Sequence, residues 1–269
     1  MVDGIFTIDA HCHIYPEKIA AKAVAGTDKF YDGINSVGTG TVEDMLNRGT
    51  AAGVDRFVVQ SVATTPKQVK SINEFIALKV SEYPDRLTGL GTLHPDSEDI
   101  KGDISHLLDL GLKGVKLHPD IQAFKMDDYR CLKIYEICEE KGLPILMHTG
   151  DSRFDYSNPN RLLPILEIYT GLTVVGAHLG GWSVWEEACD KCGGKPNLYV
   201  DCCSCFPFID SGRVLNLIRR YGAERVLFGT DYPMWSPKKE LEKLLSLGLD
   251  EKEKRYILNI NAKKIFGIV

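Results

Sequence analysis

Eight short apolar runs recur along this chain, with longer amphipathic segments between them. Runs of this length that are rich in β-branched residues are typical of buried strands, whereas apolar residues at helical spacing indicate helices. The runs are Ile5–His13, Arg56–Ser61, Leu87–His94, Gly114–His118, Pro144–Thr149, Thr173–His178, Leu198–Cys202 and Arg225–Asp231. This repeat predicts an α/β fold, a (β/α)8 or TIM barrel of parallel strands. A doubly wound open sheet is the competing architecture, but it would usually carry a Gly-rich phosphate loop after its first strand.

Two segments depart from an even repeat. Residues 14–40 are long for a first β/α loop and carry Tyr15, Phe30 and Tyr31. Long loops of this kind often form lids over active sites. Residues 250–266 add at least one helix after the eighth unit. Since no linker or change of composition divides the chain, we expect residues 1–269 to form a single barrel domain, which is a common size for this architecture.

The composition argues against several classes of function. The formal net charge of −5 is spread along the chain without a basic block, so nucleic acid is not an expected partner. No apolar stretch approaches the ~20 residues that cross a bilayer. The first residues lack the basic region of a signal peptide. We therefore expect a cytoplasmic protein, not bound to a membrane, that acts on a small molecule.

The eight cysteines are expected to be free thiols, because disulfides are rare in cytoplasmic chains. Cys131 and Cys138 lie at helical spacing among apolar residues, which is typical of core positions. Two groups leave the question open, namely the pair Cys189 and Cys192 and the cluster Cys202, Cys203 and Cys205. Together these two groups could hold a second metal ion or a redox pair, although the spacing matches no zinc pattern.

Polar residues collect at the ends of the predicted strands. The first strand ends in Asp9-Ala-His-Cys-His13, where strict alternation places Asp9, His11 and His13 on one face. Later strands end in His94, His118, His148, His178 and Asp231. In a barrel the carboxyl ends of all strands meet at one face, where the active site is built. Several imidazoles with one carboxylate suit Zn²⁺ or a similar divalent ion.

Five motifs then follow one another in the order of a known family. They are Asp9-Ala-His-Cys-His13, Lys113-Gly-Val-Lys-Leu-His-Pro119, His148-Thr-Gly150, Ala177-His-Leu-Gly-Gly181 and Phe228-Gly-Thr-Asp-Tyr-Pro233. Over essentially its whole length the chain resembles the amidohydrolase-related family, a branch of the amidohydrolase superfamily that contains aminocarboxymuconate-semialdehyde decarboxylases and lactonases. The C-terminal segment 257–266 is similar to the closing helix of that family.

The resemblance implies a ligand set. His11 and His13 match the paired ligands of the first strand, His148 matches the ligand of the fifth, and Asp231 matches the carboxylate of the eighth. His178 matches a histidine that lies beside the metal, where it contacts bound water or substrate and is a further possible ligand. This branch commonly uses one divalent ion, for which Zn²⁺ is the first choice and Mn²⁺ or Fe²⁺ the alternatives. Binuclear relatives bridge two ions at the fourth strand.

Lys116 leaves several roles open. It has the same strand parity as His118, so both side chains are expected to point inward. Lys116 is either the bridge of a second metal, a cation for a substrate carboxylate, or an interior lysine with an acidic partner. We favour one metal ion.

The implied activity is that of a metal-dependent hydrolase acting on an amide, ester or lactone. A divalent ion lowers the pKa of its bound water and so supplies the nucleophile. Asp231 is the candidate to take the proton from that water, and His178 the candidate to stabilise the charge that builds on the substrate oxygen.

The sequence limits the substrate-binding residues less closely than the metal ligands. Arg153, which follows His148, is placed either to bind a carboxylate or to form a surface pair with Asp151 or Asp155. Further candidates for the pocket wall are Lys116, His118, Trp182 and Trp235, and for the aromatic rings loop packing is an equally good explanation.

Two other functions fit the same residues. One is a metal-dependent decarboxylase of an unsaturated or aromatic acid, for which Arg153, Lys116 or Arg48 would supply a cation. The chain is shorter than the decarboxylases it resembles, which favours hydrolysis. The other is a non-catalytic metal-binding protein, against which the complete ligand set argues. Barrels of this branch are often dimers or larger, so a homo-oligomer is expected.

Overall fold

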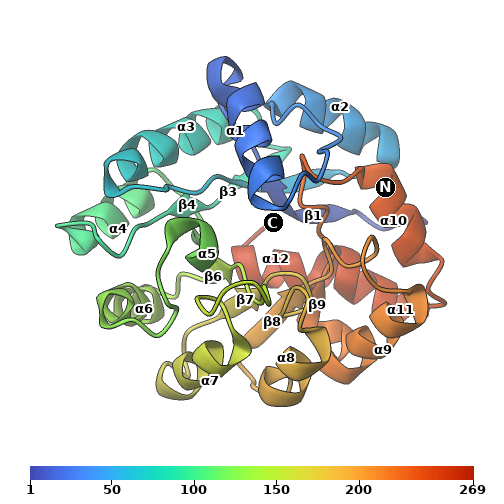
Figure 1. The fold of residues 1–269 in the computed structure, drawn as a ribbon. Coiled ribbons are helices and arrows are strands. Elements are labelled where there is room, and N and C mark those ends of the chain that lie inside the picture. Colours follow the sequence, from blue (N-terminus) through green and yellow to red (C-terminus); the bar gives the residue numbers. More distant parts are fainter.

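The computed structural model describes residues 1–269, and its strands form a ring of parallel neighbours with helices outside it (Figure 1). The strands are β1 (Ile8–His13), β2 (Arg56–Gln60), β3 (Leu87–Gly89), β4 (Gly91–Thr92), β5 (Val115–Leu117), β6 (Ile145–Met147), β7 (Val174–Gly176), β8 (Leu198–Asp201) and β9 (Val226–Leu227). Each strand lies within one of the eight predicted runs. The runs β3 and β4 are two halves of one barrel strand: Leu90 N donates to Val59 O on one side, and Gly91 N donates to Gly114 O on the other.

The ring closes between the last strand and the first. Ala10 N donates to Phe228 O over 2.9 Å, and Cys12 and Tyr232 form a further parallel bridge. Together with the parallel pairs from β1 to β3 and from β4 to β9, these bonds give the barrel predicted from the sequence.

The outer helices follow the strands in the expected alternation. They are α2 (Val42–Ala52), α3 (Val69–Glu82), α4 (Ile100–Asp109), α6 (Tyr129–Lys141), α7 (Pro159–Ile168), α8 (Trp185–Cys192), α9 (Ser211–Tyr221) and α10 (Pro237–Leu245). Thr41 and Asp210 begin α2 and α9 by accepting backbone N–H groups with their side chains. No helix is long and apolar enough to span a bilayer.

The C-terminal helix closes the barrel at the amino-terminal ends of its strands. Residues 251–266 form α11 (Glu251–Arg255), a π-helical turn over Tyr256–Ile260 and α12 (Asn261–Phe266). The α12 residues pack against inward-facing residues of the strands, and this inner cluster comprises Ile8, Ala10, Val58, Leu90, Leu146, Val175, Tyr199, Leu227, Ala262, Phe266 and Ile268. The barrel can therefore open only at the carboxyl ends of its strands.

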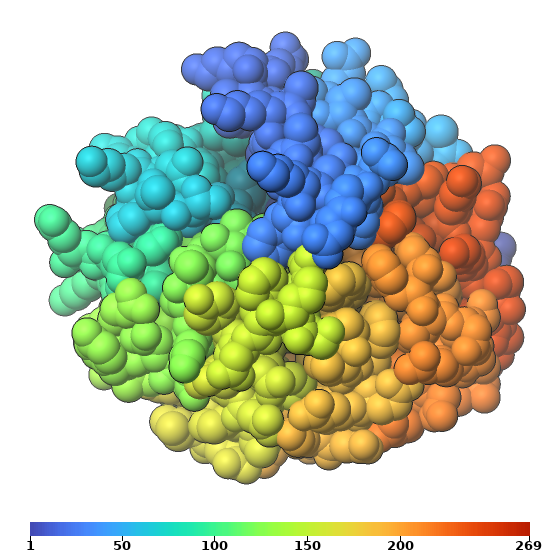
Figure 2. Space-filling model, viewed as in Figure 1, coloured from blue at the N-terminus to red at the C-terminus, as the bar shows by residue number.

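The segment 14–40, predicted as a long loop, contains a helix. This helix, α1 (Glu17–Phe30), lies across the open face of the barrel (Figures 1 and 2). A short helix, α5 (Pro119–Gln122), follows β5 at the same end. The carboxyl ends of the strands are thus covered by ordered structure.

One prediction about β1 is wrong: Asp9 does not share a face with His11 and His13. Between the pairs Asp9–Phe57 and Cys12–Val59, β1 advances by one residue more than β2, which is a β-bulge. Ile8 and Ala10 face the inner cluster, but Cys12 packs outside the ring. Asp9 faces outward with Phe57, and it accepts hydrogen bonds from Thr230 N and Oγ.

Candidate active site

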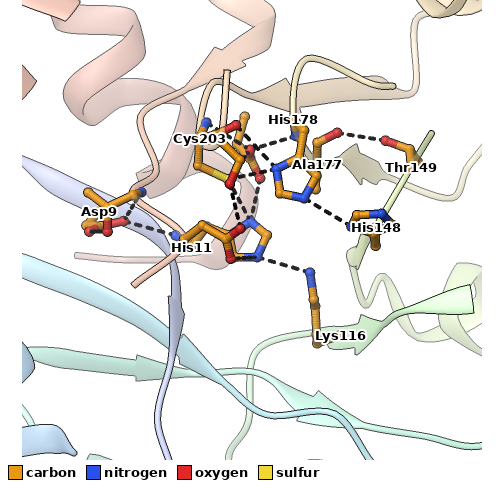
Figure 3. Close-up of polar contacts among 12 residues, drawn as sticks. Asp9, His11, Lys116, His148, Thr149, Ala177, His178 and Cys203 are labelled. Atoms are coloured by element: carbon orange, nitrogen blue, oxygen red, sulfur yellow. Dashed lines mark hydrogen bonds and ion pairs between the residues drawn. The ribbon is translucent and has the colours of Figure 1, made fainter. Parts of the chain in front are cut away.

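The polar residues predicted at the strand ends meet in one place (Figure 3). They line a single cavity of about 660 Å³ at the carboxyl face of the barrel. The predicted site residues on its wall are His11, His13, Lys116, His118, His148, His178 and Asp231. His94 is not among its lining residues; it is buried and its Nδ1 accepts from Asp96 N.

Three of these residues form a triangle of ligand atoms. His11 Nε2 lies 3.2 Å from His13 Nε2, and Asp231 Oδ1 lies 3.4 Å from the first and 3.5 Å from the second. Asp231 has a positive φ of 55°, a costly conformation for a residue other than glycine that is often found at functional sites. Ser204 Oγ donates to Asp231 Oδ2 over 2.7 Å, so Oδ1 remains directed at the two histidines.

A buried carboxylate fixes the orientation of His11. Asp201 Oδ2 lies 2.8 Å from His11 Nδ1, so Nδ1 carries the proton and Nε2 presents a lone pair to the triangle. Burial would raise the pKa of Asp201, but its electrostatic and hydrogen-bond interaction with His11 lowers it to about 2. This pairing is the arrangement by which proteins commonly orient a metal-binding imidazole.

A second pair of imidazoles faces the same cavity. His148 Nδ1 lies 3.0 Å from His178 Nε2. Because His178 Nδ1 lies 3.2 Å from Cys203 O, which can only accept, His178 Nε2 presents its lone pair. The other nitrogen of His148, Nε2, is 3.5 Å from Asp120 Oδ2 and has no other polar partner. Burial, together with neighbouring positive charge, lowers the pKa of His148 and keeps it neutral.

These contacts fit a cation. Ligand atoms bound at 2.0–2.2 Å with tetrahedral angles lie about 3.3–3.6 Å apart, close to the sides of the triangle formed by His11, His13 and Asp231. Lone pairs of neutral imidazoles that face one another repel unless a proton or a metal ion lies between them. Burial lowers the pKa of His13 and of His178, which favours the neutral, ligating form. The donor set thus suits a divalent ion.

Lys116 lies directly beside the triangle. Its Nζ is 3.1 Å from His11 Nε2, and the side chain is 1% exposed. No carboxylate lies within ion-pair distance, and burial lowers the pKa of Lys116 to about 8. The site therefore holds a buried ammonium group whose positive charge has no direct partner in the protein.

His118 links the barrel to α1. Its Nδ1 accepts from Ile121 N, so its Nε2 carries the proton that is donated to Tyr31 Oη over 2.9 Å. Its ring stacks on that of His148 with centroids 3.9 Å apart. The Tyr31 hydroxyl can then donate its own proton to an acceptor in the cavity.

Arg153 pairs with Asp151, which the sequence analysis gave as the alternative to binding a substrate carboxylate. Its guanidinium donates to both oxygens of the buried Asp151, over 3.0 and 2.8 Å. It also donates to Asp32 Oδ2 and to Phe30 O at the end of α1. Arg153 does not line the cavity; it fastens α1 to the loop after β6.

The two predicted tryptophans lie around this region rather than on the main cavity wall. Trp182 meets the Tyr31 ring edge-on, with centroids 5.5 Å apart. Trp235 Nε1 donates to Ser204 Oγ, and thereby supports the bond from Ser204 to Asp231. Arg48, a further candidate cation, pairs with Asp44 on the exposed side of α2.

Asp201 was not predicted as a residue of the site, whereas Cys203 belongs to the cysteine cluster whose role the sequence left open. Asp201 ends an otherwise apolar strand, and a carboxylate at that position was an available signal. Cys203 Sγ lies 3.3 Å from His11 Nδ1 and 3.2 Å from His178 Nδ1, whereas Cys202 and Cys205 pack in the core. All eight cysteines are buried free thiols, with Cys189 and Cys192 packed in the core on the buried side of α8.

Comparison with known proteins places the chain in a family. A family model described as amidohydrolase matches residues 8–268. The 2-amino-3-carboxymuconate-6-semialdehyde decarboxylase of Dictyostelium discoideum is 33% identical over 99 residues, which is 35% of this chain and 27% of that protein. The match thus spans about a quarter of the length of this curated relative. These findings confirm the resemblance stated from the motifs.

Solved structures share the barrel. An uncharacterised TIM-barrel protein of Bordetella bronchiseptica has a TM-score of 0.79 and 24% identity, covering 97% of this chain and 98% of its own. The 5-carboxyvanillate decarboxylase of Novosphingobium aromaticivorans, in complex with manganese and 4-hydroxy-3-methoxy-5-nitrobenzoic acid, has a TM-score of 0.76 and 16% identity, covering 98% and 97%. At such identities the likeness concerns the fold.

Proposed function

Because the chain belongs to the amidohydrolase family, we propose that it is a metal-dependent decarboxylase, which removes the carboxyl group of an organic acid as carbon dioxide. The observation that carries this proposal is the buried Lys116, which has no carboxylate partner. An unpaired buried charge is costly, and the carboxylate of a bound acid would supply its partner. The decarboxylases of Dictyostelium discoideum and Novosphingobium aromaticivorans support this choice over the hydrolase favoured by the sequence.

We propose that one divalent ion is held by His11, His13 and Asp231, with His148 and His178 beside it. When bound, the ion polarises oxygen atoms of the substrate and draws electron density away from the reacting carbon. The donor set suits Zn²⁺, and the manganese of the Novosphingobium relative makes Mn²⁺ the second choice. A second ion bridged through Lys116 is not part of the proposal.

The protonation states assign the remaining roles. Burial alone would raise the pKa of Asp231, but the neighbouring His11 and His178 lower it, so Asp231 stays ionised and is not the acid. Without a bound ion, burial lowers the pKa of Lys116 to about 8, so the ammonium form is the major one at neutral pH. When the bond to the carboxyl carbon breaks, carbon dioxide leaves and the electron pair stays on the other carbon. That carbon takes a proton from Lys116 Nζ, and solvent returns a proton to the amine.

Hydrolysis of an amide, ester or lactone is the second candidate. It is favoured by the ionised Asp231, whose Oδ2 is held by Ser204 while Oδ1 faces the cavity, as a base for water requires. A non-catalytic metal-binding protein is the third. A homo-oligomeric state, a cytoplasmic location and a single domain over residues 1–269 remain predictions.

Carbon dioxide release separates these functions. The protein loaded with Mn²⁺ or Zn²⁺ should decarboxylate at least one member of a panel that includes 2,6-dihydroxybenzoate and 5-carboxyvanillate. Replacing Lys116 with Met should lower turnover at least ~100-fold, the lower end of the range for loss of a general acid. Lys18→Met, which changes an exposed lysine at the rim of the cavity, is the matched control.

Other outcomes identify the alternatives. Lactone hydrolysis without carbon dioxide release would establish the second candidate. Tight metal binding without turnover of either class would favour the third.

A further inference from the structure

The cavity extends well beyond the polar residues of the site. Its outer part runs between α1 and α3 and is walled by Ile19, Ala23, Phe30, Ile72, Phe75 and Ile121. We call these six side chains the apolar compartment. In Figure 2 the dark-blue α1 and the cyan α3 lie on either side of this part of the open face.

The size of the cavity bears on what can fill it. A volume of about 660 Å³ corresponds to roughly 20 water molecules, each occupying ~30 Å³ in the liquid. An acid with a single ring, held at Lys116 and the ligand triangle, would leave the apolar compartment to water. Covering apolar walls that face water with an apolar group lowers the free energy. The compartment therefore fits a part of the ligand that lies beyond its reacting end.

Charge is arranged to match such a ligand. Lys116 and the triangle lie at the inner end of the cavity, whereas the walls between α1 and α3 carry no acidic side chain. The polar side chains that line the cavity beside these walls are uncharged except for Lys18; they include Thr27, Thr64, Gln68 and Ser71. A ligand with one carboxylate and one apolar arm would have both parts accommodated.

We propose that the substrate is a carboxylic acid with an apolar arm longer than a single ring, whose carboxylate lies at Lys116 and whose arm fills the apolar compartment. This inference rests on the proposed function for the position of the carboxylate. The apolar compartment itself can be tested without turnover.

Gly26 offers a direct test of the compartment. It lies within α1 and lines the cavity, and a Cβ added there meets no atom within 4 Å. Because Gly26 lines the same cavity as Ala23 and Phe30 of α1, the side chain of Gly26→Leu would occupy that part of the cavity. Gly26→Ala is the matched control because it adds only a methyl group. Both changes replace a helix glycine with a better helix former, so the fold should be retained.

The experiment is calorimetric binding of butanoate, hexanoate, octanoate and decanoate to the metal-loaded full chain. In the unaltered protein and in Gly26→Ala, the Kd should fall by up to about fourfold for each added methylene group. In Gly26→Leu, octanoate and decanoate should bind at least tenfold more weakly than to Gly26→Ala, while butanoate binds equally. A Kd that does not depend on chain length, or an unchanged series in Gly26→Leu, would overturn the proposal.

Octan-1-ol separates this proposal from the function on which it rests. It carries the apolar arm without the carboxylate. If octanoate binds more tightly than octan-1-ol and Lys116→Met removes the difference, the carboxylate lies where we propose. If the two bind equally and both are weakened by Gly26→Leu, the apolar compartment stands and the position of the carboxylate, with the proposed acid substrate, is wrong.

Discussion

Replacing Asp201 with Asn tests whether the ligand triangle depends on the orientation of His11. Asp201 is fully buried and accepts from His11 Nδ1 over 2.8 Å, from His178 N over 2.9 Å and from Cys203 Sγ over 2.9 Å. Asn has nearly the same shape, so it can keep one acceptor, but it removes the negative charge and offers N–H donors in place of the second oxygen. His11 then loses the partner that fixes its tautomer.

The expected loss follows from the role of this contact. Residues that orient a metal-binding imidazole typically contribute 10- to 100-fold in metal affinity, which corresponds to about 1.4–2.7 kcal/mol. We expect Asp201→Asn to raise the Kd for Zn²⁺ by that factor, measured by competition with a chromogenic chelator. Asp210→Asn is the control, because Asn replaces Asp well at the beginning of a helix such as α9.

Stability of the metal-free protein gives an independent check. The pKa of Asp201 is depressed from 3.8 to about 2, so its contribution is fully present above about pH 4 and is lost as the pH falls towards 2. The shift corresponds to about 2 kcal/mol, and Asp201→Asn should flatten the acid limb of the unfolding free energy. A variant that folds normally and binds Zn²⁺ as tightly as the unaltered protein would refute the assigned role of Asp201.

Two further perturbations probe the metal and a buried acid. Removing the metal with a chelator should lower the Tm of the protein, and adding Zn²⁺ at 100 times its Kd should restore about 2.7 kcal/mol of stability; a Tm that ignores both treatments would contradict a native metal site. Burial raises the pKa of Glu240 from 4.5 to about 7, so its stabilising protonated form is fully present below pH 4.5 and is lost as the pH rises through 7. Glu240→Gln should therefore raise the Tm more at pH 8 than at pH 5, and an equal change at both would contradict this account.

The fold was predictable because the pattern of a short apolar run followed by a longer amphipathic segment occurs eight times along the chain. Each predicted run contains a strand, and in most runs a histidine or Asp231 near the end of the run marks the carboxyl end of that strand. His148 and His178 lie far apart in the sequence, yet their positions after consecutive strands were enough to predict that they meet. Side-chain parity also predicted correctly that Lys116 points inward.

Other features depend on contacts that a sequence pattern does not report. Asp201 ends its strand like the predicted residues, but the lone carboxylate gave no indication that it pairs with His11 across the barrel. Arg153 had two plausible partners in the sequence, Asp151 and Asp155. It pairs with Asp151 and with an acid that was not predicted, Asp32, because α1 folds back over the loop after β6. The length of segment 14–40 predicted a lid, but the helix α1 within that segment was not predicted.

The bulge in β1 shows why strict alternation locates the ligand pair but misplaces its neighbours. In an unbroken strand Ile8, Ala10 and Cys12 would share one face, and His11 and His13 would share the other with Asp9. The inner cluster needs Ile8 and Ala10 inside the barrel, and the ligand triangle needs His11 and His13 inside as well. One extra residue in the strand satisfies both demands, because it reverses the alternation between Ala10 and Cys12. The same residue leaves Asp9 outside the ring, where it ties β1 to Thr230, next to Asp231. The bulge thus lies between the apolar part of the barrel interior, filled by Ile8 and Ala10, and the polar part that contains His11 and His13. Through the bonds from Thr230 to Asp9, it also fixes the position of β1 relative to Asp231.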